Sequence, residues 1–188
     1  MSLPAPEITY RTADRSDSEA LAAFGRRTFT ATFAHLYKPE DLNTYLNRVY
    51  TPAAMLADMA IPGTEFRLAE RGRQIIGFCK IGAVTVPLRT IPPRSIELRQ
   101  LYVDHAFHGT GVAATLMAWA LDRAHARGCE HVFLSVYSEN YRAQRFYHRH
   151  GFVVIGDYKF MVGKQADDEL IMHLMIRHTL DTPRKDPA

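Results

Sequence analysis

A strand, a glycine-containing turn and the start of a helix are encoded in residues 97–116, which read Glu97-Leu-Arg-Gln-Leu-Tyr-Val-Asp-His-Ala-Phe-His-Gly-Thr-Gly-Val-Ala-Ala-Thr-Leu116. At such a junction several backbone N–H groups point at one spot in front of the positive end of a helix. That arrangement suits a phosphate or pyrophosphate group. The segment therefore predicts a site for a phosphate-bearing ligand.

The length and composition of the chain favour one well-buried core over two domains, because 47% of its 188 residues are hydrophobic. We expect one domain over residues 1–180 and a polar, frayed tail over residues 181–188. The net charge of +3 is spread without a basic stripe, which argues against nucleic acid as a partner.

The cysteines and histidines form no pattern typical of disulfides or metal sites. Cys79 and Cys129 form no CxxC pair, and the histidine pairs at 105/108 and 148/150 lack further ligands at helical spacing. The N-terminal residues do not resemble a leader, and no run of about 18 apolar residues occurs. We therefore expect no metal, no membrane contact and a cytoplasmic location.

The spacing of apolar residues predicts which segments are helices and which are strands. Helices are predicted over about residues 18–36, from about residues 39 and 52 onward, and over residues 112–127 and 141–150. Strands are predicted over residues 8–12, 66–70, 74–81, 96–103, 131–136, 152–155 and 169–176. This order indicates the α/β class, with one central mixed, mostly antiparallel sheet of about seven strands flanked by helices.

Several kinds of phosphate-binding turn compete for the segment His108–Ala113, and a tight turn that merely starts a helix is a further alternative. A dinucleotide fingerprint needs a third glycine where Thr115 stands, and a P-loop needs a Gly-Lys-Ser/Thr tripeptide that does not occur. His108-Gly-Thr-Gly-Val-Ala113 resembles instead the acetyl-CoA pyrophosphate loop of the GNAT N-acetyltransferase superfamily. His108 stands where that loop usually has Gln or Arg, Gly111 at its glycine and Ala113 at its last position.

A later segment, Asn140-Tyr-Arg-Ala143-Gln-Arg-Phe146-Tyr147-His-Arg-His-Gly151-Phe152, is similar to a second motif of the same superfamily. Asn140 is expected to cap a helix, and Ala143 keeps that helix slim where a cofactor would pass. Phe146 and Tyr147 lie about 100° apart around the helix, so Phe146 is expected inward and the Tyr147 hydroxyl in a cleft. With both motifs in order, the chain is identified as a member of the superfamily.

The resemblance implies acetyl-CoA as co-substrate. The residues that it assigns to the cofactor are Leu101, Tyr102, Val103, His108, Gly109, Thr110, Gly111, Val112, Ala113, Asn140, Ala143 and Phe146. Leu101 and Val103 would offer backbone groups to the pantetheine arm, which would add like a short strand beside a splayed sheet.

Acetyl transfer to an amine needs one group that takes a proton from the amine and another that protonates the departing thiolate. Glu97 stands at the offset at which superfamily members carry a strand carboxylate as base, and strand periodicity places it on one face with Arg99, Leu101 and Val103. The alternative is a solvated glutamate or one paired with Arg99. Tyr147 matches the superfamily's acid, and the alternative is a helix tyrosine that packs on the sheet.

Further segments resemble the PaiA-type polyamine acetyltransferases, which implies spermidine or spermine as the acceptor. These segments are residues 28–33, Tyr37, residues 40–42, residues 45–46, residues 159–163 and residues 168–172. The carboxylates available for the ammonium groups are Glu40, Asp41, Glu139 and Asp157, which are otherwise ordinary surface charges.

Two other functions remain open at this point. One is a protein or peptide N-acetyltransferase, and the other is a non-catalytic acetyl-CoA-binding regulatory module. The apolar final strand, Leu170–Ile176, is also a candidate to pair across a homodimer.

Overall fold

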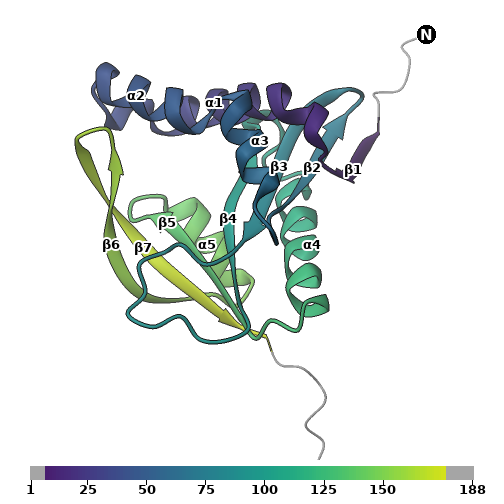
Figure 1. Cartoon of the computed structure of the whole chain (residues 1–188), viewed down its shortest axis with the longest axis vertical. Helices are drawn as coiled ribbons and strands as arrows, with labels where there is room; N and C mark the ends of the chain where they lie inside the picture. The colour runs from purple at the N-terminus through teal and green to yellow at the C-terminus, as the bar shows by residue number, and fades with distance from the viewer. Residues whose placement is uncertain (1–6, 177–188) are drawn as a thin grey trace, which may run out of the picture.

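A seven-stranded sheet forms the centre of the protein, in the computed structural model that describes residues 7–176 (Figure 1). Its strand order is β1-β2-β3-β4-β5-β7-β6, and β4 with β5 is its parallel pair while the other neighbours are antiparallel. The strands are β1 (Ile8–Thr12), β2 (Glu65–Arg71), β3 (Gln74–Gly82), β4 (Ser95–Val103), β5 (His131–Tyr137), β6 (Val153–Val162) and β7 (Gln165–Met175). The predicted mixed, mostly antiparallel sheet is therefore confirmed, whereas the predicted tail over residues 181–188 lies outside the described residues.

Helices cover both faces of the sheet and give it two separate hydrophobic cores (Figure 1). They are α1 (Ser18–Phe33), α2 (Pro39–Val49), α3 (Pro52–Ala60), α4 (Val112–Ala126) and α5 (Tyr141–Arg149). Side chains of α1, α2 and α3 pack on one face, and those of α4 and α5 pack on the other. The sequence marks several of these boundaries, since Pro39 and Pro52 open their helices and Thr51 accepts a hydrogen bond from the Ala54 N–H at 3.1 Å.

The strands β6 and β7 form a hairpin much longer than the sequence predicts. The apolar pattern leaves residues 156–168 unassigned, but they continue both strands up to a turn at Gly163, whose φ is +61°. Because β7 lies between β5 and β6, its two edges are already occupied. The expectation that Leu170–Ile176 pairs across a homodimer is therefore wrong for the described strand, since no free edge is left for a partner.

The strands β4 and β5 separate soon after they meet. Pairing joins Ser95–Glu97 to His131–Phe133 and goes no further along the described strands. Beyond that point the second half of β4 and the residues 134–137 of β5 face each other across a gap. No strand pairs across this gap, which leaves room for a ligand that adds like a strand.

A β-bulge interrupts β4 beside the gap. Lys80 of β3 pairs with Gln100, and the next residue, Ile81, pairs with Leu98, so Arg99 is the extra residue on β4. An extra residue reverses which face the following side chains occupy.

The bulge corrects the predicted facing of Glu97. Glu97 lies on the face of Gln100 and Tyr102, toward the core under α1, α2 and α3. Leu101 and Val103 lie on the other face and pack against the core under α4. The expectation that these residues share a face with Glu97 is therefore wrong, because strict two-residue alternation holds only in an unbulged strand.

Candidate functional site

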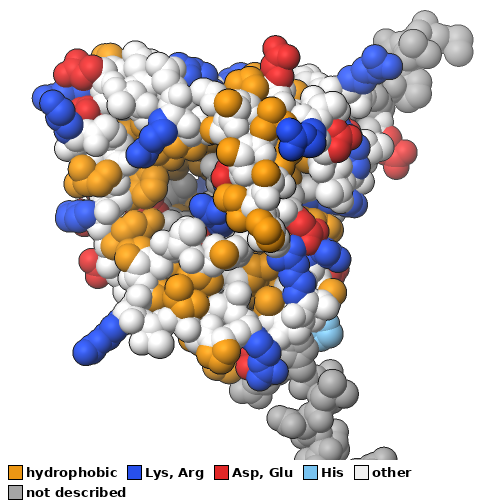
Figure 2. Space-filling model, in the orientation of Figure 1, with side chains coloured by type: hydrophobic (Ala, Val, Ile, Leu, Met, Phe, Trp, Pro, Cys, Tyr) orange, Lys and Arg blue, Asp and Glu red, His pale blue; other side chains and the backbone are white. Residues whose placement is uncertain are grey.

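A cavity of about 900 Å³ opens along the gap between β4 and β5 and continues under α1 and α2. Figure 2 shows the molecule hollowed below α1 and α2, with hydrophobic side chains on the rim of the hollow. The residues of the sequence-based site that line the cavity are Glu97, Leu101, Tyr102, Val103, His108, Gly109, Gly111, Ala113, Asn140, Ala143, Phe146 and Tyr147. The structure thus brings together segments that are far apart in sequence.

Two of the predicted cofactor residues do not line this cavity. The side chain of Val112 is buried under α4, and the Thr110 hydroxyl donates to the Phe107 carbonyl at 2.7 Å. Any contact of these two residues with a ligand would come from their backbone N–H groups, which belong to the turn and to the first turn of α4.

The turn before α4 is shaped to receive an anion. Gly109 and Gly111 have φ of +80° and +91°, and no heavy atom lies within 4 Å of where a Cβ would stand on either. Gly111 is the N-cap of α4, and no side chain caps that helix end. The N–H groups of the first turn are therefore left for an external acceptor, and the cradle fits a pyrophosphate.

His108 does not supply the positive charge that an Arg at this position would lend to the loop. Arg142 donates through Nη1 to His108 Nδ1, so the imidazole proton is on Nε2, which donates to the Val103 carbonyl at 3.0 Å. Burial, with the charge of Arg142, lowers the pKa of His108. The histidine is thus a neutral link between β4 and α5, and the cation beside the loop is Arg142, which also lines the cavity.

The helix α5 presents its motif residues to the cavity. Asn140 Oδ1 accepts a hydrogen bond from the Ala143 N–H at 3.1 Å, which confirms the predicted cap. Phe146 is half-buried and packs against the core under α4 and α5, and Tyr147 is buried in that core while also lining the cavity. Burial raises the pKa of Tyr147, so its hydroxyl keeps its proton and is able to donate it.

The carboxylate of Glu97 is held on one oxygen by the loop that follows β3. Its Oε2 accepts hydrogen bonds from the Thr85 N–H, from the Thr85 hydroxyl at 2.9 Å and from the Val86 N–H at 3.1 Å. Within residues 7–176 no ion pair joins Glu97 to Arg99, so the salt-bridged alternative is wrong. The side chain is 5% exposed and fixed, with Oε1 as the oxygen free of these bonds.

The acceptor side of the cavity is rich in phenols, and the cations Lys80 and Arg99 also line it. The Tyr50 and Tyr102 hydroxyls lie 2.9 Å apart, and Gln100 Nε2 donates to Tyr50 at 3.2 Å. Gln100 Oε1 is buried without a hydrogen-bond partner in the part of the chain that the structure describes. Lys80, although it lines the cavity, is paired with Asp58. The hydroxyl and amide oxygens offer acceptors to a ligand, which suits an amine.

Sequence reasoning missed one carboxylate in this cavity, Glu169 of β7. Burial raises the pKa of Glu169 to about 7. In the sequence Glu169 is only an acidic residue in the last apolar strand, and an acidic residue at such a position is equally typical of a solvent-facing side chain.

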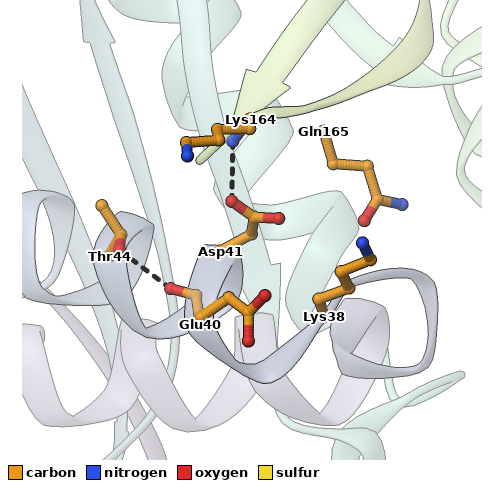
Figure 3. A pocket seen from close by; sticks show the side chains of 6 residues that line it. All are labelled: Lys38, Glu40, Asp41, Thr44, Lys164 and Gln165. Carbon is orange, nitrogen blue, oxygen red and sulfur yellow. Dashed lines mark hydrogen bonds between the residues drawn. The ribbon is translucent and has the colours of Figure 1, made fainter.

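The carboxylates that the sequence offers for a polyamine lie elsewhere. Glu40 and Asp41 line a separate cavity of about 710 Å³, where the Lys164 N–H donates to Asp41 at 2.8 Å (Figure 3). Glu139 and Asp157 are exposed and do not line the large cavity. Their predicted role is therefore wrong for the β4–β5 cavity, because the hairpin and the helices turn them outward.

The tip of the β6–β7 hairpin is joined to the segment between α1 and α2. The Tyr37 hydroxyl donates to Asp167, and Gln165 Nε2 donates to the Leu36 carbonyl. Together with the Asp41–Lys164 contact, these bonds tie the hairpin to the helices beside Tyr37, which lines the large cavity.

Residues 7–176 contain neither a metal-binding cluster nor a membrane-spanning helix. No three His, Cys, Asp or Glu side chains gather in a position to hold a metal ion. No described helix is long and apolar enough to cross a membrane.

Comparisons with known proteins identify the family of this chain. The family model described as the Acetyltransferase (GNAT) family matches residues 30–152. An uncharacterised N-acetyltransferase of Mycobacterium tuberculosis is 30% identical over 157 residues, which cover 84% of this chain and 96% of that protein.

Solved structures share the fold. The PaiA N-acetyltransferase from Thermoplasma acidophilum in complex with coenzyme A has a TM-score of 0.73 at 21% identity, covering 90% of this chain and 99% of that one. The ribosomal-protein-S18-alanine N-acetyltransferase from Escherichia coli has a TM-score of 0.69 at 15% identity, covering 94% and 98%. With its family model and its relatives in agreement, this chain belongs to the GNAT family of acetyltransferases.

Proposed function

We propose that this acetyltransferase moves the acetyl group of acetyl-CoA to the primary amine of a small cation, with a polyamine such as spermidine as the acceptor. One observation carries the proposal: a single cavity joins an uncapped, glycine-lined helix N-terminus to a space lined by carboxylates and phenols. The anion-binding end suits the diphosphate of coenzyme A. The acceptor end suits an ammonium group, which phenol faces and carboxylates both attract.

The donor would be held mainly by backbone groups. The N–H groups at Gly109, Gly111 and Ala113 face the pyrophosphate position, with Arg142 as the nearby cation. The stretch of β4 from Leu101 to Val103, which pairs with β3 but not with β5, would bind the pantetheine arm. Asn140, Ala143 and Phe146 would line the other side of the arm.

Direct attack of the amine on the thioester is the mechanism we propose, with Glu97 as the base and Tyr147 as the acid. Glu97 would take the amine's proton through Oε1, either directly or through a water molecule, while Oε2 stays bound to the loop after β3. Tyr147 would then give its proton to the departing thiolate.

An acyl-enzyme on cysteine has less support. Burial raises the pKa of Cys79 to about 12, so its thiol stays protonated at neutral pH. A buried thiol of this kind is a poor nucleophile.

The test is an assay with labelled acetyl-CoA against spermidine, simple amines and a panel of peptides. The proposal expects label in the polyamine and lower kcat in Glu97→Gln, with acetyl-CoA binding unchanged. Label in peptides alone would make the chain a peptide acetyltransferase. Binding of acetyl-CoA without transfer to any acceptor would make it a binding module.

A further inference from the structure

Glu169 is held in the cavity wall by two neighbouring strands. It pairs with Tyr137 of β5 and with Tyr158 of β6, and its side chain lines the cavity. The Ser135 hydroxyl hydrogen-bonds to its carboxylate, and the Tyr158 hydroxyl donates to Ser135 at 3.2 Å. This chain of hydroxyls fixes the carboxylate without neutralising it.

No counter-ion accompanies this carboxylate. Within residues 7–176 no Lys or Arg forms an ion pair with Glu169. Another acid, Asp167, raises its pKa further, and Arg99, Arg142 and Arg149 line the same cavity without an ion pair to Glu169. The elements around it contribute phenols, whose pKa values its charge raises: Tyr37, Tyr45, Tyr102, Tyr147 and Tyr158.

A carboxylate withdrawn from water without a cation is unfavourable, and the cost falls when a cation binds. The surrounding phenol rings add a second attraction, because a cation over a ring face is stabilised. A cationic ligand would therefore supply the counter-ion that Glu169 lacks.

Glu97 and Glu169 flank the place where β4 and β5 separate. Glu97 pairs with Phe133 and Glu169 with Tyr137, on opposite edges of β5. Their backbones are four residues apart along β5 and two strand spacings apart across it, or roughly 16 Å. Ser135 lies midway on the same face. Both carboxylates line the same cavity.

We propose that Glu169 binds a second, non-reacting ammonium group of the acceptor, so that the site selects diamines and polyamines over monoamines. This inference rests on the proposed amine acetyltransferase function and gives Glu97 and Glu169 separate tasks. Glu97 deprotonates the reacting amine, and Glu169 anchors the other end of the molecule. Gln100 Oε1, buried and without a partner among the described residues, is an additional acceptor for an N–H group between them.

The experiment compares butane-1,4-diamine with n-butylamine, which share a carbon chain and differ in one ammonium group. The ratio of their kcat/KM values is measured from pH 5.5 to 8.5 in the wild type, Glu169→Gln and Glu169→Asp. Asp157→Asn is the control, since Asp157 is an acid on β6 beside Tyr158 but outside the cavity. The ratio cancels effects that act equally on both amines.

The wild type should prefer the diamine by about tenfold to a hundredfold at pH 8, the value of a charge-assisted hydrogen bond. The preference should weaken as the pH falls through about 7, where Glu169 takes up a proton. Glu169→Gln should lose both the preference and its pH dependence. Glu169→Asp should keep part of the preference, and Asp157→Asn should keep all of it.

Two results separate the inference from the function on which it rests. If the wild type acetylates both amines with equal kcat/KM, or Glu169→Gln keeps the preference, Glu169 does not bind the second ammonium and the inference is overturned. If neither amine is acetylated, the proposed function fails. Calorimetry of butane-1,4-diamine with the coenzyme A complex then still tests the inference, which requires weaker binding to Glu169→Gln than to the wild type.

Discussion

The donor side and the acceptor side of the cavity are built from different materials. The donor side consists of the loop at 108–113, the unpaired half of β4 and the start of α5, and most of its binding groups are backbone N–H and C=O. The acceptor side collects side chains from α1, α2, β4, β5, β6 and β7. Most single substitutions should leave acetyl-CoA binding intact, because the donor side binds through the backbone. A single substitution can change which acceptor binds, because the acceptor side binds through side chains.

Tyr147 belongs to both sides, so its replacement should have the largest effect. Tyr147→Phe removes the hydroxyl but keeps the packing, and kcat should fall by about a hundredfold to ten-thousandfold, the range of a general acid. The KM for acetyl-CoA should change little. Steady-state kinetics with both substrates measures this.

The control for that variant is Tyr141→Phe, because Tyr141 is on the same helix but is 62% exposed. It should behave as the wild type. A loss of less than tenfold in Tyr147→Phe would remove the tyrosine acid from the mechanism.

The acceptor side should also carry a stability cost that the donor side lacks. In the folded protein the pKa of Glu169 is raised from 4.5 to about 7, so this residue's contribution to stability is fully present below 4.5 and is lost as the pH rises through 7. The free energy of unfolding of Glu169→Gln should therefore rise, relative to that of the wild type, by up to about 3 kcal/mol between pH 4.5 and pH 8. Urea unfolding across that range measures the difference, and a difference independent of pH would contradict the raised pKa of Glu169.

The donor side is tested at a glycine rather than at a side chain. Gly111→Ala places a Cβ in the open space of the phosphate cradle at a φ of +91°, so the KM for acetyl-CoA should rise about tenfold and the free energy of unfolding should fall by about 1 kcal/mol. Gly128→Ala is a matched control, since Gly128 has a φ of +67° and open space at the other end of α4. It should lose similar stability without any change in KM, and an equal KM increase in both would contradict the cradle.

The smallest effect is expected at Arg142, a cation beside a site whose other binding groups are mostly backbone. Arg142→Ala should raise the KM for acetyl-CoA a few-fold at low salt and less at high salt, because exposed charges are screened. Arg145→Ala, on the same helix but outside the cavity, is the control. An unchanged KM in Arg142→Ala would mean that His108 and Arg142 only join β4 to α5.

The same contrast explains what the sequence reveals. The donor side is readable because His108–Ala113 and Asn140–Tyr147 are local motifs, and local geometry follows from glycine positions and caps. The facing of Glu97 is not readable, since one bulged residue, Arg99, reverses the strand pattern. Glu169 is not readable either, because its role depends on β7 lying between β5 and β6, which no local pattern encodes.

The polyamine carboxylates illustrate the same limit. Glu40 and Asp41 are near residues that do reach the cavity, such as Tyr37 and Tyr45, yet they line a different one. Whether a helix residue faces a cavity depends on which strand crosses beneath it. Here the Asp41–Lys164 contact shows that the hairpin turn occupies Asp41 instead.

The central claim is that donor and acceptor occupy the two sides of this cavity together and react directly across the β4–β5 gap. Initial rates measured over a grid of acetyl-CoA and butane-1,4-diamine concentrations test it most directly. Direct transfer should give double-reciprocal lines that intersect, because both substrates must be bound before the acetyl group moves. Parallel lines, the pattern of an acetylated enzyme intermediate, would contradict it.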